Sequence, residues 1–169
     1  MPQLRIVDLS TYKAYSQELA IGHRDIAGFK WGDKEVIQTG ARSDAAGSFL
    51  WAMPYEDGSV SGDVDHAMKQ REVRLAYLQP RASERFADEV AQYEFCEAVI
   101  EQLIARLLRD KSGYNNAQGE WVTLSLSVQS IRTAPIEHTL GATRFLGYEL
   151  RLQVMDNANL VYDETKWDS

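Results

Sequence analysis

The sequence predicts one α+β domain, with about four antiparallel strands and one central helix packed on one face of the sheet. Three observations predict this fold class: a long stretch of helical periodicity in mid-chain, strands of alternating polarity on both sides of it, and turn residues between them. The chain has 169 residues, of which 44% are hydrophobic. A chain of this size and composition can bury one ordinary core.

The first predicted element is a short helix over residues 10–22. Ser10 or Thr11 can cap its beginning, its apolar residues recur at spacings of three and four, and Gly22 is placed to end it. These apolar residues are Tyr12, Tyr15, Leu19 and Ala20. Residues 24–47 are interrupted by glycines, so we expect an irregular linker there, with at most a turn or two of helix after Asp33.

The α+β core is expected over residues 48–155. Its first strand, 48–55, is rich in aromatic and apolar residues and ends at Pro54. Residues 56–70 carry acidic and turn residues, which predicts a long hairpin loop or an extra short strand. The next strand, 71–78, alternates with a period of two, and Pro80 stops it.

The strongest helical pattern covers residues 82–109. Ser83 is a plausible N-cap, acidic residues follow near the start, and basic residues gather near the end, as the helix dipole prefers. Its apolar stripe is Phe86, Val90, Tyr93, Ile100, Leu103 and Leu107, and Phe95, Val99, Ile104 and Leu108 widen it. The apolar surface is therefore wider than a sheet alone would cover.

Two long strands of alternating polarity, 122–128 and 146–154, are predicted to close the core. Their apolar faces are Val122, Leu124, Leu126 and Val128 in the first strand and Leu146, Tyr148, Leu150, Leu152 and Val154 in the second. The segment between them, 130–142, is longer than a tight hairpin needs and is expected to project as a loop or arm. Residues 156–169 are expected to form a C-terminal tail.

Composition restricts the classes of partner. There are 18 Lys and Arg against 25 Asp and Glu, a formal net charge of −7, which is opposite to the basic surface that nucleic acids require. No stretch approaches the roughly 20 apolar residues that span a bilayer, and the N-terminus lacks a secretory pattern. Cys96 is the only cysteine, which excludes an internal disulfide and fits a cytosolic protein.

Residues 23–25 read His-Arg-Asp, the tripeptide of the protein-kinase catalytic loop. A kinase needs an Asn five residues after the Asp, where this chain has Lys30. Only 22 residues precede His23, too few for a nucleotide-binding lobe, and no Asp-Phe-Gly follows. We therefore do not expect a kinase.

No other catalytic pattern replaces it, and we predict no catalytic residue, cofactor or metal. His23, His66 and His138 stand in three different predicted loops, without the spacing of a zinc site. Asp63, Asp65 and His66 could gather around a cation, but the calcium-loop pattern is absent and a solvated turn is the simpler interpretation. Cys96 lies among apolar helix residues and is expected to be a buried structural thiol. Glu137 and His138 have no assignable Ser or Cys nucleophile.

Large aromatic residues exceed what one four-stranded layer readily covers, and such residues anchor protein interfaces. Four Trp and eight Tyr contribute to this excess. The candidate subunit-interface residues are Trp31, Trp51, Phe95, Val99, Tyr162 and Trp167. The alternative, that Trp167 and Tyr162 of the tail pack on their own domain, stays open.

Three segments, together with the order strand pair, helix, strand pair, resemble the small tail-terminator and neck proteins of tailed bacteriophages and prophages. They are "GDKEVIQTGARSDAAGSFLWAMPY", "FADEVAQYEFCEAVIEQLIARLLRD" and "RFLGYELRLQVMDNANLVYDETKW". The resemblance implies a non-enzymatic virion subunit, assembled in the bacterial cytoplasm as a homohexameric ring. Such a ring ends the tail tube, joins it to the head connector and lets DNA pass through its lumen. The loops 56–70 and 130–142 would then be arms for neighbouring subunits or the tube.

Two other functions remain open. The chain could belong to another bacterial tube, such as a contractile injection assembly, which would share this fold. It could also be a small α+β enzyme or ligand-binding protein, with Tyr148, Tyr77 and His138 near the mouth of a pocket between helix and sheet.

Overall fold

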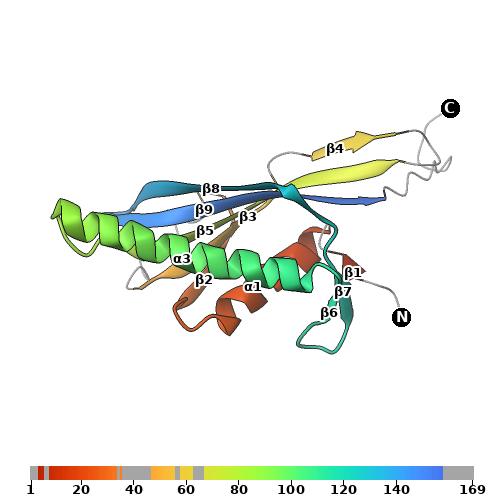
Figure 1. Ribbon diagram of the computed structural model, residues 1–169, viewed down its shortest axis with the longest axis horizontal. Helices are drawn as coiled ribbons and strands as arrows, with labels where there is room; N and C mark the ends of the chain where they lie inside the picture. The colour runs from red at the N-terminus through yellow and green to blue at the C-terminus, as the bar shows by residue number, and fades with distance from the viewer. Residues whose placement is uncertain are drawn as a thin grey trace.

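The computed structural model describes residues 4–5, 8–33, 35, 47–55, 58–62 and 67–157 (Figure 1). This part of the chain forms an α+β fold with two helices and two sheets. The helices are α1 (Leu9–Gly22) and α3 (Phe86–Asp110). The strands are β1 (Leu4–Arg5), β2 (Gly28–Trp31), β3 (Phe49–Met53), β4 (Gly58–Ser61), β5 (Met68–Pro80), β6 (Tyr114–Asn115), β7 (Trp121–Thr123), β8 (Leu126–Leu140) and β9 (Thr143–Asn157).

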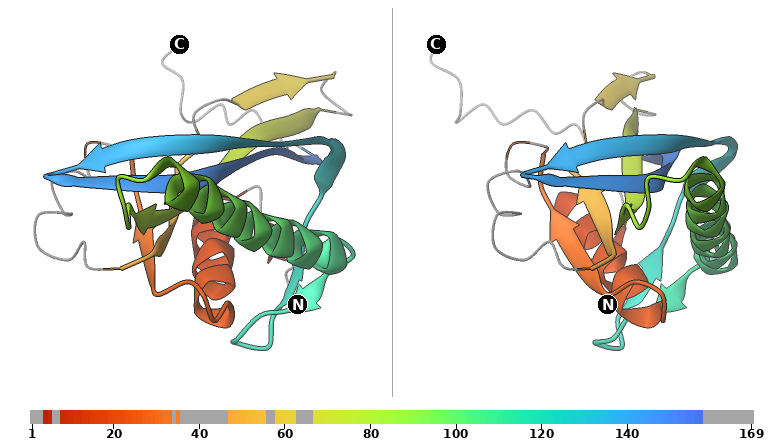
Figure 2. Two further views of the ribbon diagram at one scale, coloured as in Figure 1. Left: turned by 60° about the vertical axis from the view of Figure 1, so that its left-hand side comes forward. Right: turned by 90° about the vertical axis from the view of Figure 1, so that its left-hand side faces the viewer.

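Both predicted helices are confirmed, and both lie on the same face of the larger sheet (Figures 1 and 2). Helix α1 packs on β2 and β3, and α3 runs along β9 and β5. Asp8, not Ser10 or Thr11, occupies the N-cap of α1, and Arg85 occupies that of α3. Ser83 lies two residues before this cap, where its Oγ accepts a hydrogen bond from the Arg85 N–H at 3.1 Å.

The larger sheet is mixed and six-stranded, which corrects the prediction of about four antiparallel strands beneath one central helix. Its order is β2-β3-β5-β9-β8, with β4 also paired to β5. Strand β2 runs parallel to β3 inside the predicted linker 24–47, which is therefore not irregular throughout. Phe29 and Trp31 alternate with Lys30 in this short strand, but the glycines around it had predicted irregular structure. Residue 34 and residues 36–46 of the predicted linker lie outside the described part.

The predicted projecting loop 130–142 is mostly strand. Strand β8 continues to Leu140 and turns into β9 through two residues, with Gly141 at a φ of +62°. Pro135 is tolerated within β8, because β8 lies at the sheet edge, where a missing N–H need not be paired. The predicted strand 122–128 is split: β7 joins the small sheet β1-β7-β6, and β8 begins at Leu126.

Apolar side chains gather on both faces of the larger sheet. The main cluster lies between the sheet and the helices and includes the predicted apolar face of α1, namely Tyr12, Tyr15, Leu19 and Ala20. A second cluster on the opposite face joins β3 to the end of the β8–β9 hairpin; its members are Phe49, Trp51, Met53, Ala76, Leu78, Leu140 and Phe145. Strand β3 is consequently buried along its whole length.

Gly147 on β9 lies very close to the backbone of β5. A Cβ added to Gly147 would lie 2.0 Å from the Tyr77 carbonyl oxygen, so only glycine fits at this position, where β9 runs beside β5. Figure 2 shows the twist of the sheet: β2 and β3 run steeply relative to β8 and β9.

The sheet also extends beyond both helices as a three-stranded arm (Figure 1). The arm consists of β4, the beginning of β5 and the end of β9, paired through Ser61↔Met68 and Met68↔Asn157. All four residues of β4 are exposed. The predicted extra short strand within 56–70 is thus present, and residues 158–169 of the predicted tail lie outside the described part.

Candidate interaction surfaces

The predicted interface residues lie in different environments. Trp51 and Val99 are each only 2% exposed and belong to the two apolar clusters of this chain. The Trp51 indole N–H also donates a hydrogen bond to the Gly32 carbonyl at 2.8 Å. Neither side chain offers surface to a neighbour in this structure, because β3 is covered on both faces and Val99 faces the sheet.

The other predicted interface residues differ in accessibility. Phe95 is 42% exposed on α3. Trp31 is half-buried, with its ring 5.4 Å from that of Tyr12 in an edge-to-face arrangement. Tyr162 and Trp167 lie outside the described residues. Phe95 and Trp31 therefore stay predictions as interface residues.

The residues suggested for a pocket between helix and sheet do not converge. Tyr77 is buried, and its hydroxyl donates to the Asp25 carbonyl at 2.8 Å. Tyr148 lies near α3, whereas His138 pairs with Phe145 on the other face of the sheet, 5.3 Å from the Trp51 ring. These three residues therefore do not line one pocket between helix and sheet, as the prediction had placed them.

The His-Arg-Asp segment connects α1 to the rest of the molecule. His23 Nε2 lies 3.0 Å from the Gln102 side-chain oxygen on α3, and the Asp25 carbonyl accepts hydrogen bonds from Tyr77 and Ser48. These contacts give the tripeptide a structural role, which is to hold the loop after α1 against the rest of the fold.

Cys96 is buried, as predicted, and burial raises the pKa of its thiol to about 12. Within the described residues, no three His, Cys, Asp or Glu side chains are placed to hold a metal ion. Asp63, Asp65 and His66 lie outside that part. None of the helices in the described ranges is long and apolar enough to cross a membrane.

One open groove runs between α3 and the edge strand β8. Its volume is about 540 Å³, and we call it the acidic groove. It is lined by Val90, Tyr93, Glu94, Glu97, Pro135, Ile136, Glu137 and Tyr148. The floor is apolar and aromatic, and carboxylates stand around it.

The carboxylates of the acidic groove belong to a longer stripe on α3. Glu94, Glu97 and Glu101 follow one another at spacings of three and four, and therefore share one side of the helix. None of the ion pairs among the described residues involves these three carboxylates. Burial, with the neighbouring Glu97 and Glu101, raises the pKa of Tyr148, which indicates a negative local potential.

A row of arginines crosses the opposite face of the sheet. Arg74, Arg151 and Arg132 stand in register on β5, β9 and β8. Glu149, whose side chain is only 6% exposed, accepts hydrogen bonds from Arg74 and Arg151, with the Arg74 Nε–Glu149 Oε1 distance at 3.1 Å. Burial alone would raise the pKa of Glu149, but the two arginines outweigh it and hold this pKa below its usual value.

Arg132 is held by a break in the strand register. The pairing of β8 with β9 shifts between Ser127 and Arg132. The Arg132 guanidinium donates to the carbonyls of Gln129 at 2.8 Å and Ile131 at 2.9 Å. These two backbone dipoles hold the side chain in place without neutralising its positive charge.

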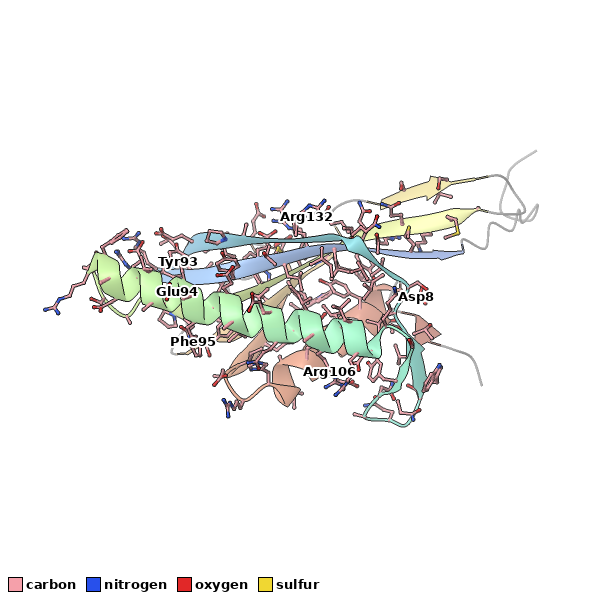
Figure 3. The ribbon with its side chains drawn as sticks, viewed as in Figure 1. Asp8, Tyr93, Glu94, Phe95, Arg106 and Arg132 are labelled. Carbon is pink, nitrogen blue, oxygen red and sulfur yellow. The ribbon has the colours of Figure 1, made fainter. Side chains whose placement is uncertain are left out.

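A second groove of about 540 Å³ lies beside Arg132 and Arg151, and we call this surface the arginine face. It is lined by Glu72, Ser127, Gln129, Ser130, Arg132, Arg151, Leu152 and Gln153. Figure 3 shows Arg132 on the side of β8 away from α3, whereas Tyr93 and Glu94 come from the helix. The acidic groove and the arginine face thus lie on opposite sides of one hairpin.

No protein-family model matches this chain, and no curated protein matches it.

The sequence signals for the two surfaces differ. Residues 86–105 carry acidic side chains but no Lys or Arg, a local pattern from which an acidic helix side could have been predicted. The arginine row had no such signal, because Arg74, Arg132 and Arg151 lie far apart in the chain and meet only through strand pairing.

Proposed function

We propose that this chain is a non-enzymatic structural subunit of a phage or prophage tail, similar to tail terminators. It assembles as a ring, expected to be a hexamer, that ends the tail tube and joins it to the head connector. The α+β architecture, with strands before and after one long helix, supports this proposal together with the resemblance of the three segments quoted above.

The arm is the observation that carries the proposal. It extends the sheet beyond both helices, and all of β4 is exposed, with Val60 at 54%. Among the described residues β4 pairs only with β5, and a free strand edge of this kind can pair with another chain, whereas single-chain proteins generally shield such edges. An arm of this kind suits a subunit that reaches over a neighbour or over the end of a tube.

Exposed apolar side chains on α3 add to this argument. Phe86 is 80% exposed, Phe95 42% and Leu108 41%. A ring subunit needs two sides that are covered by neighbours, and aromatic residues are common at the centre of such contacts.

The proposal is tested by expressing the chain with the tail-tube and connector proteins encoded beside its gene. Electron microscopy should show the chain as a ring at one end of each tube, and tubes should grow to a more uniform length when it is present. Neighbouring genes of a metabolic pathway, or tubes that never carry the chain, would contradict the proposal.

A further inference from the structure

We propose that copies of this chain associate head to tail, with the arginine face of one copy against the acidic groove of the next. The inference deepens the proposed function and rests on it, because it assigns the contact between ring subunits to particular side chains.

The acidic groove suits a basic partner. Glu94 and Glu101 are exposed and Glu97 is half-buried, all on the outer side of α3. Beside them, Val90 is 39% exposed, and Pro135 and Tyr148 complete an apolar floor. A partner that covers the floor brings these carboxylates into a drier environment, where each needs a cation.

The arginine face offers those cations. The Arg151 side chain is 49% exposed although it binds Glu149, and Arg132 is exposed with hydrogen bonds to backbone carbonyls. Glu149 is shared by Arg74 and Arg151, and Glu72 also lines the groove, so the three arginines keep a local excess of positive charge over these two carboxylates. Guanidinium groups bind carboxylates through paired N–H donors, which matches the glutamate stripe of a second copy.

The positions of the two surfaces favour a repeating contact. Because they lie on opposite sides of the β8–β9 hairpin, one copy can use its arginine face toward one neighbour and its acidic groove toward another. A contact between two different patches is heterologous, and it continues until the rotation closes a ring. This arrangement is what a ring subunit requires.

The test uses two variants that each lose a different surface. Arg132→Glu disables the arginine face, and Glu94→Lys with Glu97→Lys disables the acidic groove. Wild-type protein is expected to self-associate in sedimentation velocity at about 20 mM salt, and less at about 0.5 M, where charges are screened. Each variant alone should associate about tenfold more weakly or stay monomeric.

Mixing the two variants decides the geometry. Each retains the surface that the other has lost, and the two altered surfaces carry exchanged charges, so an equimolar mixture should associate again, with the two variants alternating. A chain with all three changes should regain self-association, because the charges are exchanged on both sides. That result would also show that the substitutions leave the fold intact.

Arg24→Glu is the matched control, because Arg24 is a 91% exposed arginine in the loop after α1 and should not alter association. A wild-type chain that stays monomeric at low salt, variants that still associate fully, or a mixture that stays monomeric would each overturn the head-to-tail contact. Rings that form through other residues would overturn this contact alone. Chains that bind no tube would contradict the proposed function and leave the contact intact.

Discussion

Glu149 is a residue whose charge depends on its neighbours. Its carboxylate lies between Arg74 and Arg151 on the face of the sheet opposite the helices, and its side chain is 6% exposed. A buried carboxylate is tolerated only when it is paired, and removing it leaves the arginines without their counter-charge. The stability of the folded chain is therefore expected to depend on pH through the ionisation of Glu149.

We expect Glu149→Gln to lower the free energy of unfolding at pH 7 by about 1–3 kcal/mol. The pKa of Glu149 is lower in the folded chain than the unfolded value of about 4.3, so its ionised form stabilises the fold above that pH. This stability is lost as the pH falls through the folded pKa. The difference between variant and wild type in urea denaturation should therefore shrink below about pH 4.

Glu84→Gln is the control for this pH experiment, because the Glu84 side chain is 85% exposed and its ion pair with Arg81 lies at the surface. A change of less than about 0.5 kcal/mol is expected there. An equal pH dependence in the two variants would contradict the role given to Glu149.

Gly147 is a residue without a side chain whose position cannot accept one. We expect Gly147→Ala to destabilise the fold by about 1–3 kcal/mol or more, because the added Cβ would meet the Tyr77 backbone. Gly22→Ala is the matched control, since a Cβ added there, at the end of α1, would meet nothing within 4 Å beyond its own helix. Thermal unfolding of both variants measures the difference, and equal melting temperatures would contradict the close approach.

At the scale of an element, α3 serves two environments. Cys96, Val99, Ile100, Leu103 and Leu107 face the sheet and are buried. The glutamate stripe lies on one exposed flank of α3, and the exposed Phe95 lies on another (Figure 3). The helix thus holds the core together on one side and presents a charged flank and a separate apolar flank to its surroundings.

Cys96 reports whether α3 stays on the sheet. Its thiol lies 3.8 Å from the Leu146 carbonyl oxygen, and its pKa of about 12 leaves almost no thiolate near pH 8. We expect a thiol reagent such as Ellman's reagent to leave native protein unreacted over minutes and to modify one equivalent after denaturation. Rapid reaction of the native chain would show that α3 opens from the sheet.

At the scale of the whole molecule, the two apolar clusters share one sheet. Strands β5 and β9 contribute side chains to both, so neither cluster can form without the central pair of strands. We expect denaturation to be one cooperative transition. Tryptophan fluorescence, which includes Trp51 of the second cluster, should follow the same curve as circular dichroism of the helices.

Two separated transitions would show that the clusters unfold independently.

Leu75→Ala provides a second test of cooperativity, because Leu75 is buried in the main cluster on β5. It should shift both signals together by about 2–5 kcal/mol. A shift of the helical signal alone would contradict a single cooperative unit.

The sequence by itself determined the elements whose signals are local. The positions of α1 and α3, the apolar face of α1 and the alternation along β5 and β9 all follow from side chains a few residues apart, which periodicity records. The burial of Cys96 follows in the same way from its apolar helical neighbours.

Only the tertiary structure decided how the strands pair. The parallel β2–β3 contact, the strand through Pro135, the second apolar cluster and the row of Arg74, Arg151 and Arg132 depend on which strands become neighbours. Pairing partners such as Arg74 and Arg151 lie far apart in the chain, and their contact is set by closure of the whole sheet. Local propensity carries no record of that closure, which is why a surface formed by side chains from several strands has no sequence signal.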